Sequence, residues 1–209
     1  MTDAAPAFPG PADLYSLAGE VAVITGGGRG IGEGIARAMA AAGAKVVVAA
    51  RRTAEIEAVA QSIRDEGGDA LAVTTDVLDD AAQDALARTA VDRFGRITIW
   101  VNNAGGASER TALHEMNREQ WDRCLALNLT AVWAGIVVAA RHIDTGCIIN
   151  ISSGAGTGPV PGSGHYGAAK AGVNSLTQTA AAELAPRIRV NGIMPGAIQL
   201  ILAVFVGAG

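Results

Sequence analysis

Cysteine is scarce in this chain, which has only Cys124 and Cys147 among its 209 residues. The two lie in apolar surroundings, with no CxxC pair and no histidine at the spacing of a metal site. This argues against a disulfide scaffold and against a cysteine-based metal centre. We expect two small buried hydrophobic residues in a reducing cytoplasm, and no bound metal.

Charge is also sparse, since Asp, Glu, Lys and Arg make up 17% of the residues and the net charge is −4. Lysine and arginine are scattered along the chain and form no basic stripe. Proteins that bind a phosphate backbone usually carry such a stripe. Nucleic acid is therefore not an expected partner.

Long hydrophobic runs are missing as well. The most apolar run, residues 197–209, is 13 residues long, which is too short to span a bilayer. Residues 1–18 contain prolines and lack the basic and apolar regions of a signal peptide. We expect a soluble, cytoplasmic protein with no membrane partner, made of a flexible tail (1–18) and one domain (19–209).

Hydrophobic residues make up half of the chain, enough for a real core. Short β-branched runs alternate with longer helical patterns, and most runs are apolar nearly throughout, as in parallel strands covered on both faces. Strands are predicted at 20–26, 44–50, 70–76, 97–103, 147–153 and 187–193. The alternation predicts an α/β fold with a doubly wound parallel sheet and helices on both faces. Ligands of such sheets bind at the carboxyl ends of the strands.

Two of the helical patterns are distinctive. Within residues 53–68, apolar side chains at i, i+3, i+4 and i+7 predict a surface helix that ends at a glycine pair. Residues 117–143 predict a more deeply buried helix, which begins at the cap residue Asn117 with Gln120 three positions later. The tryptophans lie in apolar strand or helix patterns and are expected in the core: Trp100, Trp121 and Trp133.

The end of the first strand carries a glycine-rich turn with Gly26, Gly30 and Gly32, preceded by Thr25 and followed by a helix. Glycines allow a tight turn and close backbone approach, and a helix N-terminus presents N–H groups to an anion. The spacing differs from G-x-G-x-x-G, and a glycine-rich turn without a ligand is the alternative. Its place between the first strand and the first helix favours a phosphate cradle.

The end of the second strand reads Ala50, Arg51, Arg52. Enzymes that prefer NAD carry an acidic residue near this point for the ribose 2′-hydroxyl. Two guanidinium groups instead suit the 2′-phosphate of NADP, and Arg29 in the glycine turn adds a third positive charge. The alternative is that these arginines cap a loop and face water. The pattern favours NADP(H) over NAD(H).

Two further strand ends carry small or polar residues. Residues 102–106 read NNAGG and suit a cofactor lying across them. After the fifth strand come Ser152 and Ser153, and Tyr166 follows 13 residues after Ser153. Lys170 stands four residues beyond Tyr166, so the two side chains share one face of a helix. The alternative for this pair is an ordinary solvated helix face.

In this order, the motifs TGGGRGIG, NNAG, LNLT, NISS, YGAAK and RVNGIMPG resemble the short-chain dehydrogenase/reductase family over residues 18–198. Within the family, the NNAGG and RVNGIMPGAI sequences are most similar to those of bacterial hydroxysteroid-type and 3-oxoacyl-carrier-protein-reductase-type members. The resemblance implies a Rossmann-like oxidoreductase that transfers hydride between NADP(H) and a small-molecule carbonyl or secondary alcohol.

The resemblance also implies four catalytic residues. Tyr166 would be the general acid/base; a free phenol has a pKa of about 10, and the ammonium of Lys170 would favour the phenolate. Lys170 would also bind the nicotinamide ribose. Ser153 would hydrogen-bond the reacting oxygen, with Ser152 as the runner-up. Asn128 would anchor a water that links Lys170 to solvent.

The cofactor residues follow in the same way from the matching motifs. Asp76 and Val77 match an adenine contact, and Pro195, Gly196 and Ile198 match the segment that flanks the nicotinamide. The full expected set comprises Thr25, Gly26, Arg29, Gly30, Ile31, Gly32, Arg51, Arg52, Asp76, Val77, Asn103, Ala104, Gly105, Tyr166, Lys170, Pro195, Gly196 and Ile198.

The chain departs from the family pattern after Ile198. Leu200 stands where the family has a threonine, and the expected substrate lid, last helix and last strand do not follow. We therefore expect a homo-oligomer nearer a dimer than a tetramer, and a nucleotide-binding module without turnover is the alternative function. His165, beside Tyr166, is expected to line the substrate loop or lie at the surface.

Overall fold

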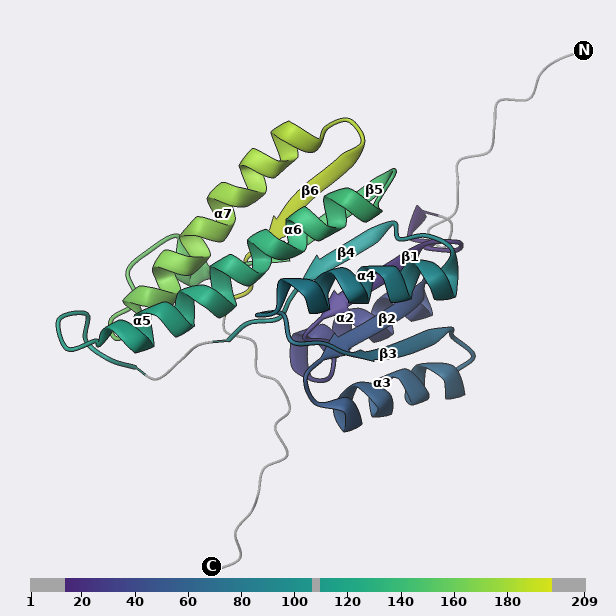
Figure 1. The fold of residues 1–209 in the computed structure, drawn as a ribbon, viewed down its shortest axis with the longest axis horizontal. Coiled ribbons are helices and arrows are strands. Elements are labelled where there is room, and N and C mark those ends of the chain that lie inside the picture. The colour runs from purple at the N-terminus through teal and green to yellow at the C-terminus, as the bar shows by residue number, and fades with distance from the viewer. Residues whose placement is uncertain (1–13, 107–109, 197–209) are drawn as a thin grey trace, which may run out of the picture.

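The computed structural model describes residues 14–106 and 110–196. A parallel sheet of six strands forms the middle of the molecule, with the order β3-β2-β1-β4-β5-β6 (Figure 1). The strands are β1 (Val21–Thr25), β2 (Lys45–Ala50), β3 (Ala70–Thr74), β4 (Ile99–Asn102), β5 (Gly146–Ile151) and β6 (Ile188–Ile193). All six predicted strands are present, and their bounds differ from the prediction by at most two residues.

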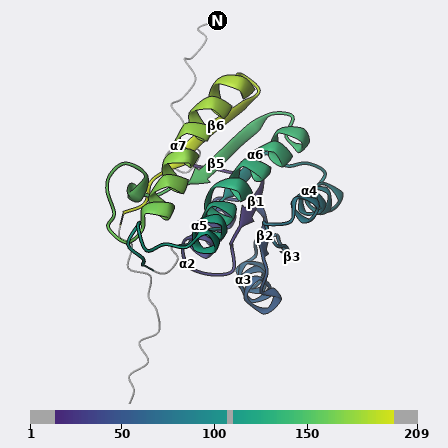
Figure 2. The same cartoon turned by 60° about the vertical axis from the view of Figure 1, so that its left-hand side comes forward.

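Helices cover both faces of the sheet, as predicted (Figures 1 and 2). They are α2 (Gly30–Ala41), α3 (Thr53–Asp65), α4 (Asp80–Phe94), α5 (Arg118–Leu125), α6 (Ala131–His142) and α7 (Gly164–Leu184), with a π-helical turn η1 (Ala126–Thr130) and a 3₁₀ turn η2 (Gly154–Gly156). Helices α2 and α3 pack on one face, and α4, α6 and α7 pack on the other. The strand order reverses between β1 and β4, where ligands of doubly wound sheets bind.

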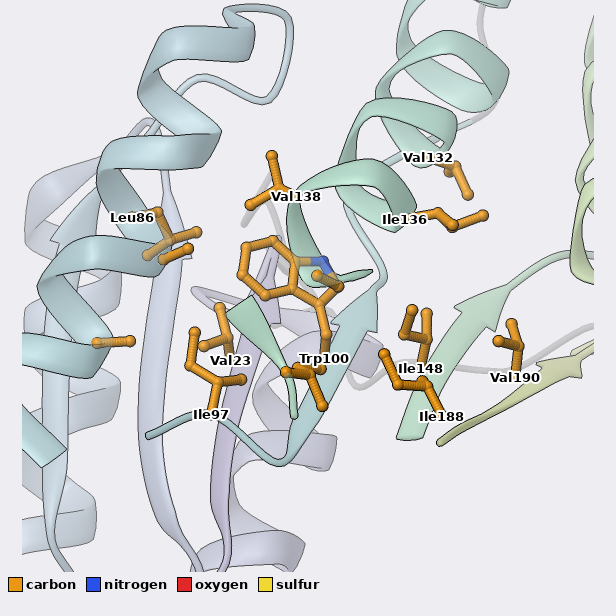
Figure 3. Packing of buried hydrophobic residues seen from close by; sticks show 14 of the residues in the cluster. Val23, Leu86, Ile97, Trp100, Val132, Ile136, Val138, Ile148, Ile188 and Val190 are labelled. Atoms are coloured by element: carbon orange, nitrogen blue, oxygen red, sulfur yellow. The ribbon is translucent and has the colours of Figure 1, made fainter. Parts of the chain in front are cut away.

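The core on the α4, α6 and α7 face is built around Trp100 of β4. Its ring is fully buried and lies among Val23 of β1, Leu86 of α4 and Val138 of α6 (Figure 3). Every residue of β1 is buried, because side chains that point to either face meet a helix layer. This is why the strand sequences are apolar throughout and do not alternate.

A chain of buried polar groups crosses the same core. The Trp100 indole N–H donates to Asn102 Oδ1 at 2.8 Å, and the Asn102 amide donates to Asn150 Oδ1 at 2.9 Å. Asn150 then donates to the Thr177 hydroxyl of α7 at 2.9 Å. Each link satisfies a polar group that would be costly to bury alone, so the chain fixes β4, β5 and α7 relative to one another.

The predicted helix at 117–143 exists, but it comprises α5, η1 and α6 in series. It begins with the expected capping box, in which Asn117 and Gln120 bond each other's backbone N–H groups. By length and composition Arg118–His142 could cross a membrane, yet half of its most apolar window is buried inside the molecule. It packs against α4 and α7 as a core helix.

Several expectations for single residues need correction. Trp100 is in the core and Trp121 is half-buried, but Trp133 is 48% exposed on the outer side of α6. A helix that is apolar nearly all round gives no sign of which side the rest of the fold covers. His165 is not at the surface; it is buried in the first turn of α7. Cys124 is buried, whereas Cys147 is only partly buried, and neither forms a disulfide.

Candidate active site

The glycine turn between β1 and α2 has a backbone shape and close contacts that require glycine at several positions. Gly26 and Gly30 have φ values of +66° and +61°, which side chains of L-residues rarely adopt. A Cβ on Gly32 would lie 2.3 Å from the carbonyl oxygen of Gly26. Ile31 and Gly32 stand in the first turn of α2, where N–H groups lack intrahelical acceptors. The cradle fits a phosphate group of a dinucleotide.

Thr25 fastens the NNAGG segment to this turn. Its hydroxyl accepts hydrogen bonds from the N–H groups of Asn103 (3.0 Å) and Ala104 (3.1 Å) and donates to Val101 O at 3.1 Å. The Asn103 side chain donates to the carbonyl oxygens of Thr25 (2.9 Å) and Gly26 (3.1 Å). Thr25 and Asn103 therefore hold two loops together, and the N–H of Ala104 takes part in the same contact.

The two arginines after β2 are exposed, beside the glycine turn. The N–H of Gly27 donates to the carbonyl of Ala49 at 3.2 Å, which joins the turn to the end of β2. Arg52 Nε lies 2.8 Å from Glu55 Oε1. The sequence reasoning did not single out Glu55, although its i, i+3 spacing from Arg52 is a visible signal. Arg29 is exposed at the N-cap of α2.

The segment after β3 forms a turn in front of α4. Asp76 Oδ1 accepts a hydrogen bond from the N–H of Leu78 at 3.0 Å, so the carboxylate shapes this turn. Val77 is buried, and its carbonyl accepts from the buried Gln83 amide at 2.8 Å. The turn stands at the same carboxyl edge of the sheet as the glycine turn.

Lys170 is the buried cation of the site. Only 3% of the residue is exposed, and its Nζ donates to the carbonyl oxygen of Ile151 at 2.8 Å. Desolvation lowers the pKa of Lys170 to about 8. Nζ lies 5.6 Å from the centroid of the Tyr166 ring, which is one helical turn earlier on α7 and half-buried. The solvated-face alternative is therefore wrong for Lys170.

Asn128 sits in the π-helical turn η1 and is buried. Its Oδ1 accepts from the N–H of Gly106 at 3.0 Å, and its Nδ2 donates to Gly106 O at 3.0 Å and to Cys124 O at 3.1 Å. A Cβ on Gly105 would lie 2.9 Å from Asn128 Oδ1 and 3.6 Å from Lys170 Nζ. The fold thus brings Asn128, Gly105 and Lys170 together. A π turn often marks a functional site, but the sequence carried no sign of it.

The two serines after β5 have separate surroundings. Ser152 is buried, and its hydroxyl donates to the carbonyl of Lys170 at 3.1 Å. Ser153 is half-buried, and its hydroxyl accepts from the N–H of Ala155 at 3.2 Å. A Cβ on Gly167 would lie 3.0 Å from Ala155 O, so the Ser153 loop packs on the first turn of α7. The Ser152 hydroxyl therefore donates within the fold, whereas the Ser153 hydroxyl is the acceptor in its bond with Ala155.

The segment after β6 runs beside these serines. The N–H of Ser152 donates to Ile193 O at 2.8 Å, and the N–H of Gly154 donates to Pro195 O at 3.2 Å. Gly196 follows Pro195 and is exposed. Ile198 lies outside the described residues. Within residues 14–106 and 110–196, no group of three or more His, Cys, Asp or Glu side chains could hold a metal ion.

Comparison with known proteins places this arrangement in a family. The family model for short chain dehydrogenases matches residues 20–203. A 3-oxoacyl-[acyl-carrier-protein] reductase of Synechocystis is 42% identical over 190 residues, which cover 88% of this chain and 76% of that protein. A 3beta-hydroxysteroid dehydrogenase of Eggerthella lenta is 41% identical over 193 residues, covering 88% of this chain and 72% of that protein.

A solved structure supports the same family assignment. A crystal structure described as a short-chain alcohol dehydrogenase from Sinorhizobium meliloti superposes with a TM-score of 0.86 at 33% identity, covering 91% of this chain and 77% of that one. Sequence, fold and site geometry therefore agree: the chain is a member of the short-chain dehydrogenase family, an oxidoreductase family with a Rossmann-like fold.

Proposed function

We propose that this protein is a cytoplasmic oxidoreductase that uses NADP(H) in preference to NAD(H) to interconvert a carbonyl and a secondary alcohol. The observation that carries the proposal is the convergence of Tyr166, Lys170 and Asn128 beside the NNAGG loop. A buried ammonium whose position is fixed by a strand-end carbonyl is costly to maintain, and a chain without catalysis has no need of it.

The cofactor residues would work as one cradle. The backbone of Gly26, Gly30 and Gly32 would face the diphosphate, and Arg29, Arg51 and Arg52 would supply positive charge for a 2′-phosphate. When bound, the nicotinamide supplies or accepts the hydride. Asp76 and Val77 would border the adenine, and Pro195 and Gly196 would border the nicotinamide.

The protein's own residues would carry out the proton transfer to the substrate oxygen. In the reduction direction, Tyr166 would donate its phenolic proton to the carbonyl oxygen, and with the hydride that a bound nicotinamide would supply to the carbonyl carbon the product would be a neutral alcohol. Ser153 donates a hydrogen bond to the same oxygen and orients it. Lys170, in its cationic form, stabilises the resulting phenolate. Asn128 keeps the NNAGG loop in place through its paired bonds to Gly106.

For the substrate, we propose an apolar ketone or alcohol of the 3-oxoacyl or hydroxysteroid type. The two relatives named for those substrates support this choice, each at more than 40% identity. The stretch from Gly154 to Gly164, which would border the substrate, consists mainly of small and apolar residues.

The test is a fluorescence titration of the purified chain with NADPH and with NADH, followed by a panel of 3-oxoacyl thioesters and oxosteroids. We expect tighter binding of NADPH and a loss of the reduced-cofactor signal when a ketone is added. Binding without any turnover across the panel would contradict the enzyme assignment and favour a nucleotide-binding module.

A further inference from the structure

Glu55 has a position that the proposed function does not use. It stands in the first turn of α3, and its Oε1 lies 2.8 Å from Arg52 Nε. A Cβ on Gly28 would lie 3.1 Å from Glu55 Cβ and 3.4 Å from Glu55 Oε2. One carboxylate therefore pairs with Arg52 and lies close to Gly28 of the glycine turn.

The glycine turn and the end of β2 form a single wall at this point. The N–H of Gly27 bonds Ala49 O, and a Cβ on Gly27 would lie 2.6 Å from Val48 Cγ1. An anion held between the glycine turn and Arg51 or Arg52 would consequently lie near the Glu55 carboxylate. The side chain of Glu55 is 34% exposed, so solvent screens its charge only in part.

Two effects of Glu55 on a 2′-phosphate oppose each other. The carboxylate repels the phosphate and neutralises part of the Arg52 charge. It also holds Arg52 through Nε, which leaves the terminal nitrogens of the guanidinium for a ligand. The orienting effect is small, because the Arg52 side chain is 59% exposed and such surface pairs contribute little order. Repulsion of a group with a charge of about −1.5 to −2 is the larger effect.

The same carboxylate has the opposite effect on NADH. A ribose 2′-hydroxyl can donate a hydrogen bond to an acidic side chain, which is how many dinucleotide sites select NAD. We propose that Glu55 is a specificity-determining residue, which weakens the NADP(H) preference set by the arginines and admits NAD(H) as a second cofactor. This inference rests on the proposed function, because it requires a dinucleotide in the glycine cradle.

The test compares Glu55→Gln with Glu57→Gln in the full chain. Glu57 is on the same helix, is exposed, and pairs with Arg64 at 3.6 Å. At low ionic strength, we expect Glu55→Gln to tighten NADPH binding by about threefold to tenfold. NADH binding stays the same or weakens in this variant, and Glu57→Gln changes neither affinity. The gain with NADPH diminishes as salt is added.

An unchanged ratio of the two affinities in Glu55→Gln would overturn the inference and leave the oxidoreductase assignment intact. Weaker NADPH binding would also overturn it, by showing that Glu55 serves mainly to orient Arg52. If the unmodified chain binds neither dinucleotide, the inference and the proposed function fall together. Far-UV circular dichroism of both variants verifies that the fold is retained.

Discussion

The ammonium of Lys170 donates a hydrogen bond to the carbonyl oxygen of Ile151 at 2.8 Å, in a place where only 3% of the lysine is exposed. Ile151 is the last residue of β5, and Lys170 lies in the second turn of α7. The bond orients the cation toward the Tyr166 ring and compensates part of the cost of burying it. The proposed catalytic geometry and the folding stability therefore depend on the same group.

The buried lysine should make stability depend on pH. The pKa of Lys170 falls from 10.5 to about 8 on burial, so between pH 8 and 10.5 the unfolded chain binds more protons than the folded one. Stability due to this residue therefore rises with pH across that window. We expect urea denaturation to show a gain between pH 7.5 and 9.5 that is about 2 kcal/mol larger in the wild type than in Lys170→Met. Equal gains in both proteins would show that Lys170 is not desolvated in the folded state.

Tyr166 should be needed for proton transfer and little else. Tyr166→Phe removes the hydroxyl and keeps the ring, so we expect turnover of any ketone substrate to fall by at least about a hundredfold. NADPH affinity should change by less than about twofold, because the cradle is intact. The control is Tyr15→Phe, at an exposed tyrosine. Turnover that survives in Tyr166→Phe would remove the tyrosine from the mechanism.

The arginines after β2 should contribute to NADPH binding selectively. We expect Arg51→Ala combined with Arg52→Ala to weaken NADPH binding by about tenfold or more, since two charge-assisted contacts are lost. NADH binding should change far less, because NADH has no 2′-phosphate. Arg118→Ala, at an exposed arginine that pairs with Asp122 on α5, is the control. Similar losses for the two cofactors would refute the 2′-phosphate role.

Two glycines of α2 offer a matched pair of substitutions. Gly32→Ala would place a methyl group 2.3 Å from the carbonyl oxygen of Gly26, so the glycine turn must move. We expect it to abolish cofactor binding and to destabilise the fold by about 1–3 kcal/mol. Gly34→Ala meets no atom within 4 Å and should stabilise the helix by about 0.5–1 kcal/mol with cofactor binding intact. Thermal unfolding with and without NADPH measures both effects, and a Gly32→Ala protein that still binds NADPH would contradict the cradle.

Much of the fold could be predicted from local patterns. Continuous apolar runs identify the six strands, because a strand with helices on both faces needs no polar side. The apolar stripe at Ile56, Val59, Ala60 and Ile63 gave α3, and all four residues are buried. Asn117 and Gln120 form the predicted capping box, because both partners lie within one helical turn.

The site was predictable where motif and strand end coincide. Thr25 and Asn103 are far apart in sequence, yet the sheet order β1 next to β4 brings them into contact. Tyr166 and Lys170 share a helix face by spacing alone. The preference for Ser153 over Ser152 came from spacing and stays a prediction, and the structure adds that the Ser152 hydroxyl donates to Lys170 O.

The sequence by itself determined the strands, the helix caps and the motifs at the strand ends, because each depends on neighbours within a few residues. Only the tertiary structure decided that Trp133 faces outward while His165 is buried, and that the side chain of Lys170 is desolvated. It also decided the π turn that aims Asn128 at Gly106, and the contact of Glu55 with the glycine turn. These features depend on which distant segments pack together, and the local periodicity of the sequence does not predict such packing.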